Sequence, residues 1–195
     1  MINPVDQQLV LASGSRYRAE LLQRLHLPFE ARSPDTDETP MPGEAVSAMT
    51  RRLARAKATA LSTTFPGAWI LGSHQSAACG DRILGKPGTL ERARDQLRSL
   101  SGRSVDFLTA VALVRDEQIL EGLDVTTVRF RRLDDAEINR YLDAEPALDC
   151  AGSFKCEGLG ITLFEEIDSR DPTGLIGLPL ILTSQLLRQA GFRLP

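Results

Sequence analysis

The chain has 195 residues, of which 42% are hydrophobic and 25% charged, a balance typical of a folded globular protein. Its 23 basic and 26 acidic residues give a formal charge of −3, which disfavours binding of nucleic acid through bulk positive charge. Two histidines disfavour a multi-histidine metal site, and three cysteines without CxxC spacing disfavour a disulfide scaffold. We find neither a leader-like pattern nor an apolar run of roughly 18 residues. We therefore expect one cytoplasmic domain over residues 1–195, with neither a membrane nor a nucleic-acid polymer as partner.

The first third of the chain predicts a strand, a helix, an acidic loop and a second helix. Residues 9–12 are apolar, and a Ser-Gly-Ser turn then precedes leucines at helical spacing. Residues 34–40 carry three carboxylates between prolines and predict a loop. Residues 44–63 predict an amphipathic helix. Its expected apolar stripe consists of Ala45, Met49, Leu53, Ala56 and Ala60.

The rest of the chain alternates strand and helix patterns, with one pair of adjacent strands. Residues 68–71 predict a buried strand that ends at residues 72–75, and a hairpin follows over residues 79–84. Thr89 and Asp134 are expected to cap helices, the latter in a capping box with Glu137. Further strands are expected at residues 105–114, 119–130 and 161–167, and a final helix at 180–190. The pattern predicts an α/β fold with a mixed sheet flanked by helices.

Residues 13–18 form the first candidate site. Ser13, Ser15 and Arg18 lie where a strand leads into a helix, whose free N–H groups and positive dipole end attract anions. Alternatively, Ser15 only caps the helix and the arginines are solvated.

The acidic loop is the second candidate. Asp35, Asp37 and Glu38 are oxygen donors on one short segment, and hard cations such as Mg²⁺ prefer oxygen ligands. A solvated turn is the alternative interpretation of the same residues.

Residues 80–86 match the GxxxxGK pattern of a phosphate-binding loop, but Pro87 replaces the hydroxyl residue that would hold magnesium. We therefore reject this motif and retain Lys86 as a possible phosphate contact. Lys57 is expected to be a surface lysine on its helix unless a partner faces it.

The glycine-rich segment 151–160 predicts a loop with mixed polarity. Glu157 could accept two hydrogen bonds from the N–H donors of a guanine edge. An ordinary surface loop is the alternative.

Five short motifs match, in order, the pattern of a known family. They are Ser13, Ser15, Arg18, Leu21 and Leu22 for SxSxxRxxLL, Asp37, Glu38 and Thr39 for D-E-T, Lys57 and Ala58 for a helical lysine before alanine, Gly72, Ser73, His74 and Gln75 for G-S-D-Q, and Gly85, Lys86 and Pro87 for G-K-P. On these motifs the chain resembles the Maf family of nucleotide pyrophosphatases. Residues 150–158 and 177–179 resemble the branch that acts on 7-methyl-GTP, whereas the dTTP and UTP branch usually carries Gln where Glu157 stands.

The resemblance implies hydrolysis between the α and β phosphates of a nucleoside triphosphate, with a divalent cation (Mg²⁺, Mn²⁺ or Co²⁺) as cofactor. It also implies a bent sheet with two lobes around a central cleft, similar to inosine-triphosphatase-like enzymes, and a homodimer. The roles that it implies are phosphate binding by Ser13, Ser15 and Arg18, catalysis by Lys57, His74 and Lys86, metal binding by Glu38, and base specificity from Tyr17, Gln75 and Glu157.

His74 departs from the family pattern, which has Asp at this position as proton acceptor. An imidazole with an ordinary pKa near 6.5 could accept a proton at neutral pH, but it lacks the negative charge. Imidazole binds Mn²⁺, Co²⁺ or Zn²⁺ better than Mg²⁺. The alternatives are therefore a nucleotide-binding protein with weak or no catalysis, or a dTTP/UTP pyrophosphatase.

Overall fold

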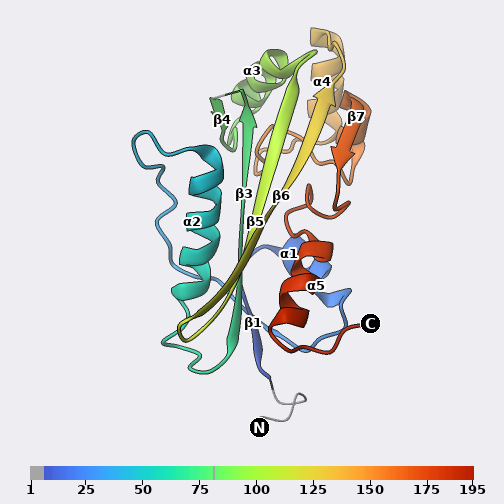
Figure 1. Ribbon diagram of the computed structural model, residues 1–195. Helices are drawn as coiled ribbons and strands as arrows, with labels where there is room; N and C mark the ends of the chain where they lie inside the picture. The colour runs from blue at the N-terminus through green and yellow to red at the C-terminus, as the bar shows by residue number, and fades with distance from the viewer. Residues whose placement is uncertain (1–6, 81) are drawn as a thin grey trace. The chain divides into compact units, whose positions relative to one another are not determined.

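The computed structural model describes residues 7–80 and 82–195 (Figure 1). The chain divides into two compact units. Unit 1 comprises the chain through Gln75 together with Thr109–Asp124 and Asp171–Pro195, and unit 2 comprises Ser76–Leu108 and Val125–Arg170. The single domain expected over residues 1–195 stays a prediction.

Within the described residues the strands form one seven-stranded sheet in the order β2-β1-β3-β5-β6-β7, with β4 paired to β3. Strand β1 is parallel to β2 and β3, whereas the β3–β4 and β6–β7 pairs are antiparallel. The predicted mixed α/β class is therefore confirmed. The strands are β1 Leu9–Ala12, β2 Glu30–Arg32, β3 Trp69–Cys79, β4 Arg82–Leu84, β5 Ser104–Arg115, β6 Gln118–Phe130 and β7 Phe164–Ser169.

Five α-helices flank the sheet in the described part of the chain, and none of them is long and apolar enough to cross a membrane. They are α1 Arg16–Gln23, α2 Val46–Thr59, α3 Leu90–Leu100, α4 Asp135–Ala144 and α5 Leu180–Gln189. The helices expected after residue 15, from Thr89, from Asp134 and at the C-terminus are confirmed.

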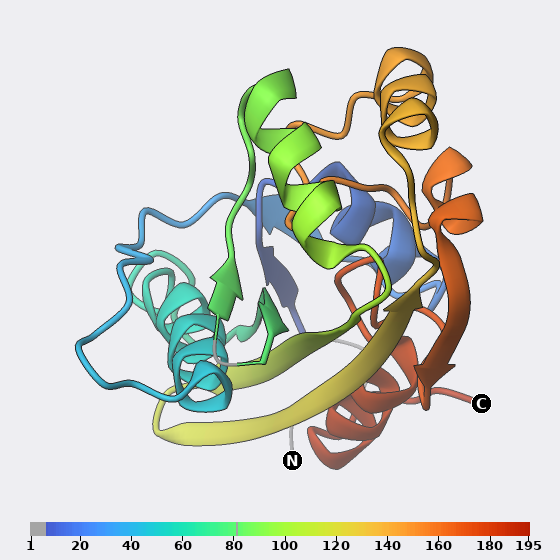
Figure 2. The same cartoon turned by 90° about the horizontal axis from the view of Figure 1, so that it is seen from above.

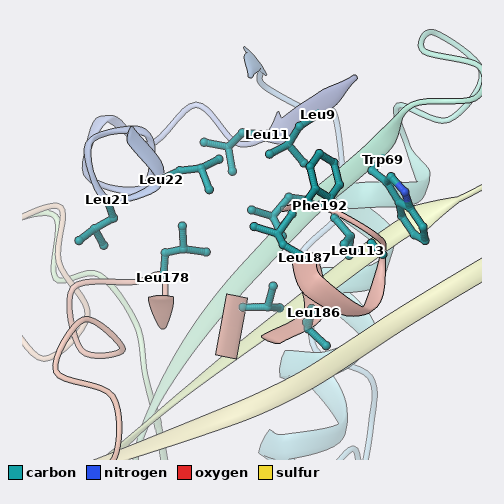
Figure 3. Close-up of a cluster of buried hydrophobic side chains, with 13 residues drawn as sticks. Leu9, Leu11, Leu21, Leu22, Trp69, Leu113, Leu178, Leu186, Leu187 and Phe192 are labelled. Atoms are coloured by element: carbon teal, nitrogen blue, oxygen red, sulfur yellow. The ribbon is translucent and has the colours of Figure 1, made fainter. Parts of the chain in front are cut away.

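Unit 1 has helices on both faces of its part of the sheet. In Figure 1, α1 and α5 lie on one side of β1 and α2 lies on the other, and Figure 2 shows the same arrangement from above. Successive side chains of β1 alternate between the two faces. Leu9 and Leu11 pack into a cluster with leucines of α1 and α5 (Figure 3), whereas Val10 and Ala12 pack with Ala58 of α2.

Helix α2 is shorter than predicted, and its buried face is rotated from the expected stripe. Ala45 and Ala60 are exposed, whereas Ala54 and Ala58 are buried against the sheet. The cause is a close approach to β3, because a Cβ on Gly72 would lie 2.2 Å from the carbonyl oxygen of Ala54. Glycine at this position therefore brings α2 close to the strand.

We expected strand β3 to end at residues 72–75. Instead it continues through these residues to Cys79. The polar residues that suggested a loop lie inside a strand. Ser73 is fully buried, and His74 and Gln75 are half-buried. The polar side chains of Ser73 and Gln75 are accommodated by hydrogen bonds to Gly177 and to Thr109, Gly174 and Leu175.

Unit 2 contains the capped helices and an aromatic cluster. Asp134 and Glu137 form the predicted capping box at α4, and the Thr89 hydroxyl accepts a hydrogen bond at the start of α3. The rings of Phe107, Phe130, Phe154 and Phe164 pack edge to face. The strand expected over residues 161–167 instead begins at Phe164, because a 3-10 helix occupies Leu159–Leu163.

Candidate functional site

The N-terminus of α1 is organised by two serines. Ser15 caps the helix, since its hydroxyl accepts a hydrogen bond from the main-chain N–H of Arg18 at 3.4 Å. Ser13 is 6% exposed, and its hydroxyl accepts from the main-chain N–H of Ser15 at 3.1 Å. The capping interpretation of Ser15 is thus confirmed, and the positive end of the helix dipole remains available to an anion.

Arg18 connects this helix terminus to a distant loop. Its Nε donates to the carbonyl oxygen of Gly177 at 2.9 Å, and its Nη1 donates to the Ser13 hydroxyl at 3.4 Å. Burial lowers the pKa of Arg18 to about 10, while Glu38 acts in the opposite direction. The guanidinium is therefore charged at neutral pH and held in one orientation, rather than being a solvated surface group.

Lys57 projects from α2 and forms an ion pair with Glu38 of the acidic loop. The Lys57 side chain is 13% exposed, whereas the Glu38 side chain is 50% exposed. The condition under which Lys57 would not be an ordinary surface lysine is therefore met, because Glu38 of the acidic loop faces it. This pair brings a predicted metal ligand and a predicted catalytic residue together.

His74 lies among positive charges. Its pKa is lowered to about 4, first by burial and then by Lys57, with smaller contributions from Arg18 and Arg52, while Glu38 acts in the opposite direction. The ordinary pKa that we assumed from sequence is therefore incorrect. The imidazole is neutral at pH 7, and burial and the net effect of the nearby cations make it a weak base.

Gln75 and Ser73 are held by main-chain carbonyls from the far end of the sequence. The Gln75 side-chain nitrogen donates to the carbonyl oxygens of Gly174 at 3.0 Å and Leu175 at 3.1 Å, and to Thr109 Oγ1 at 2.9 Å. The Ser73 hydroxyl donates to the carbonyl oxygen of Gly177 at 3.1 Å. The Gln75 amide nitrogen is thus already bound by protein, and a role in base specificity would fall to its oxygen.

The acidic loop is tied to α2 by Arg52, a residue that sequence reasoning did not single out. Arg52 binds both carboxylate oxygens of Glu44 at 2.7 Å and the carbonyl oxygen of Thr39 at 3.3 Å. Asp37 accepts from the Thr39 main chain at 2.9 Å and from its hydroxyl at 2.6 Å, and these bonds lower the pKa of Asp37. Glu38 lies between these two anchored residues.

The acidic loop offers a limited set of metal donors. Within residues 7–80 and 82–195, no group of three or more His, Cys, Asp and Glu side chains is placed to hold a metal ion. Glu38 supplies one carboxylate, Asp35 is exposed, and the charge of Glu38 favours the protonated form of His74. Such a donor set fits a cation that takes most of its ligands from substrate phosphates and water.

Tyr17 is half-buried on the first turn of α1, and the guanidinium of Arg16 lies 5.9 Å from its ring centroid. The Tyr17 ring thus already has a cation–π contact with Arg16 in its own helix. A planar ligand stacked on that face of the ring would displace the Arg16 guanidinium.

The two remaining predicted residues belong to unit 2. Lys86 is exposed just after β4. Glu157 is also exposed, and its carboxylate lies 3.3 Å from the thiol of Cys156. Burial, together with Glu157, raises the pKa of Cys156 to about 12, so this thiol is protonated at neutral pH.

Known proteins resemble this chain over nearly its full length. The family profile described as "Maf-like protein" matches residues 8–190. A protein of Xanthomonas oryzae pv. oryzae (strain MAFF 311018) named 7-methyl-GTP pyrophosphatase is 57% identical over 188 residues, which cover 96% of this chain and 99% of that protein. Proteins of the same name from Polaromonas sp. (strain JS666 / ATCC BAA-500) and Bordetella pertussis (strain Tohama I) are each 53% identical, covering 99% and 96% of this chain and 89% and 94% of those proteins.

Solved structures are more distant. A HAM1 protein from Coxiella burnetii is 20% identical with a TM-score of 0.49, covering 94% of this chain and 96% of that chain. The Staphylococcus aureus Ham1 protein is 11% identical with a TM-score of 0.48, covering 65% of this chain and 73% of that chain. Because both scores are below 0.5, the description of the fold rests on the strand order and helices given above.

Proposed function

The chain belongs to the Maf family, and on that premise we propose that it hydrolyses 7-methyl-GTP to 7-methyl-GMP and pyrophosphate. The observation that carries this proposal is the cationic cluster of unit 1, in which Arg18 and Lys57 both act electrostatically on His74. A triphosphate is the complementary ligand, because it concentrates negative charge on a short chain. The choice of 7-methyl-GTP is supported by the names of relatives that are 53% to 58% identical.

Arg18 and the serines of α1 bind the phosphates in this proposal. The guanidinium is oriented by the Gly177 carbonyl and the Ser13 hydroxyl before any ligand arrives. A charged donor that is already in place loses little conformational freedom when the phosphates bind. Lys57 supplies a second positive charge in this proposal. The phosphates would compete with the Glu38 carboxylate for the Lys57 ammonium group.

Glu38 would hold the divalent cation, which would take its other ligands from substrate phosphates and water. When bound, such a cation would polarise a phosphoryl oxygen and neutralise developing charge. If the cation bound His74 instead of leaving it free as a base, Mn²⁺ or Co²⁺ would be preferred over Mg²⁺, because imidazole favours these ions.

His74 accepts a proton from the attacking water in this proposal. Its pKa of about 4 belongs to the ligand-free protein, in which Lys57 and Arg18 oppose protonation. A bound triphosphate adds negative charge beside these cations, which raises the pKa of the imidazole toward its ordinary value. Substrate binding thereby makes His74 a better base.

Tyr17, Gln75 and Glu157 remain our predicted base-recognition residues, and Lys86 remains a predicted catalytic residue that contacts a phosphate. The 7-methylguanine ring is cationic, so an aromatic face and a carboxylate both favour it over guanine. The evidence for these assignments is the resemblance of the motifs to the family pattern.

The test is pyrophosphate release from 7-methyl-GTP, GTP, UTP and dTTP with Mg²⁺, Mn²⁺ and Co²⁺. We expect 7-methyl-GTP to have the highest kcat/KM, and faster turnover of UTP or dTTP would contradict the substrate assignment. The His74→Asp variant separates catalysis from binding alone. If the natural chain has no activity and the His74→Asp variant has activity, the natural chain is a nucleotide-binding protein.

A cytoplasmic location and a homodimer complete the proposal. Light scattering coupled to size-exclusion chromatography tests the oligomeric state, and a mass near the monomer value of 21.3 kDa would contradict the dimer.

A further inference from the structure

Helix α5 is capped by a side chain from the loop that precedes it. Its N-cap residue is Pro179, which has no side-chain acceptor. Asp171 takes over this function, since its Oδ2 accepts from the main-chain N–H of Ile181 at 2.6 Å and of Leu182 at 3.4 Å. Asp171 is 2% exposed, so its charge is buried against the positive end of the helix dipole.

Thr173 completes this cap and closes the loop formed by residues 171–179. Its hydroxyl accepts from the N–H of Leu180 at 2.8 Å and lies 2.9 Å from the carbonyl oxygen of Leu178. Asp171 Oδ1 in turn accepts from the Thr173 main chain at 3.1 Å and lies 2.7 Å from its hydroxyl. The start of α5 and the start of the loop are therefore tied together by two side chains.

The closed 171–179 loop presents main-chain carbonyls to the candidate site. The Gly177 carbonyl accepts from both Arg18 and Ser73, and the Gly174 carbonyl accepts from Gln75. Gly177 has a φ of +123°, a conformation that disfavours any residue with a Cβ. The direction of its carbonyl therefore depends both on this glycine and on the anchoring of the loop at Asp171.

We propose that Asp171 is a positioning residue that acts through the 171–179 loop, fixing the Gly177 carbonyl that orients the Arg18 guanidinium. Asp171 acts on the ligand only through Gly177 and Arg18. The kinetic consequence rests on the proposed function, whereas the orientation of Arg18 does not. The two can therefore be tested separately.

The first experiment measures Arg18 directly in the ligand-free protein. The Arg18 Nε–H resonance is assigned by its loss in the Arg18→Lys variant, and its hydrogen exchange is followed by NMR. In Asp171→Ala we expect exchange to be at least tenfold faster, because the hydrogen bond to Gly177 is no longer held. Asp134→Ala is the matched control, since it removes an aspartate cap from α4 in unit 2.

The second experiment is kinetic. Asp171→Ala should raise KM for 7-methyl-GTP about tenfold, the order expected when a charge-assisted hydrogen bond is misplaced, with a smaller change in kcat. Asp134→Ala should leave KM unchanged. A general loss of folded protein would instead lower the apparent kcat and leave KM unchanged, so the KM shift separates positioning from stability.

Two further variants keep the test decisive if Asp171→Ala does not fold. Thr173→Val removes the other half of the cap, and Gly177→Ala disturbs the carbonyl while leaving Asp171 in place. Both should reproduce the faster exchange and the higher KM. The proposal would be overturned if these variants fold and both their Arg18 Nε–H exchange rate and their KM stay within twofold of the values for the natural protein. If the natural protein hydrolyses no nucleotide, the proposed function fails, and the exchange measurement still decides the role of Asp171.

Discussion

Arg18, Ser73 and Gln75 in unit 1 each donate to a main-chain carbonyl of the 171–179 loop, whereas Lys86 and Glu157 in unit 2 are exposed. The two units thus hold their predicted site residues differently. Fixed donors lose little conformational freedom on binding, whereas an exposed long side chain must be ordered at that moment. If the predicted roles hold, Arg18 in unit 1 would be ready for a phosphate before the ligand arrives, whereas Lys86 and Glu157 would have to be ordered on binding.

The largest effect is expected when Arg18, a side chain that is held in place before binding, is removed. Arg18→Ala should lower kcat/KM for 7-methyl-GTP by about 10²–10³, the usual effect of losing a positioned electrostatic donor. Arg24→Ala, an exposed residue just after the same helix, is the control and should have no effect. A loss below tenfold in the Arg18 variant, measured by pyrophosphate release, would show that preorganisation contributes little.

The burial of His74 in unit 1 makes stability dependent on pH. The unfolded chain binds the His74 proton near pH 6.5, whereas the folded protein binds it only near pH 4. Since the unfolded state holds more protons in this window, the free energy of unfolding falls as pH drops from 6.5 to 4, by at most about 3 kcal/mol.

Urea titrations of the ligand-free protein and of His74→Asn across this pH range measure the effect. The variant should lose this part of the pH dependence. His26→Asn, which alters the exposed histidine, should keep it. If the free energy of unfolding changed equally with pH in all three proteins, His74 would be solvated, contrary to its half-buried position in β3.

A smaller effect is expected in unit 2. Glu157→Gln should reduce the preference for 7-methyl-GTP over UTP about tenfold, since hydrogen bonds to a charged group contribute about 1.5–3 kcal/mol and the amide keeps one acceptor. The KM for UTP should stay unchanged. Glu91→Gln, another exposed glutamate of unit 2, is the control. An unchanged preference would remove Glu157 from base recognition and favour a pyrimidine substrate.

The smallest effect concerns stability alone. Asp134→Ala should lower the free energy of unfolding by about 1 kcal/mol, because it removes the N-cap of α4. Chemical denaturation measures this loss, and pyrophosphate release should not change at a temperature where the variant is folded. A change in KM would show that unit 2 influences the predicted phosphate-binding residues of unit 1.

Local patterns were sufficient for much of the fold. The capping box of Asp134 and Glu137 and the cap at Thr89 were predicted because a cap depends on residues within one turn. Strand β3 was predicted to end too early, because Gly72 to Gln75 read as a polar turn. Their partners, Thr109 and the 171–179 loop, are at least 34 residues away in sequence. No local pattern identifies such distant acceptors.

The sequence by itself determined the α/β class, the capped helices and the motifs that indicated Ser13, Ser15, Arg18, Glu38 and Lys57. The tertiary structure alone decided how these groups are held, because hydrogen bonds between distant segments and burial depend on the packed chain. It supplied Glu38 as the ion-pair partner of Lys57, and it lowered the pKa of His74 to about 4. The physical reason is that desolvation and charge–charge interactions act through space, whereas caps and periodic patterns act along the chain.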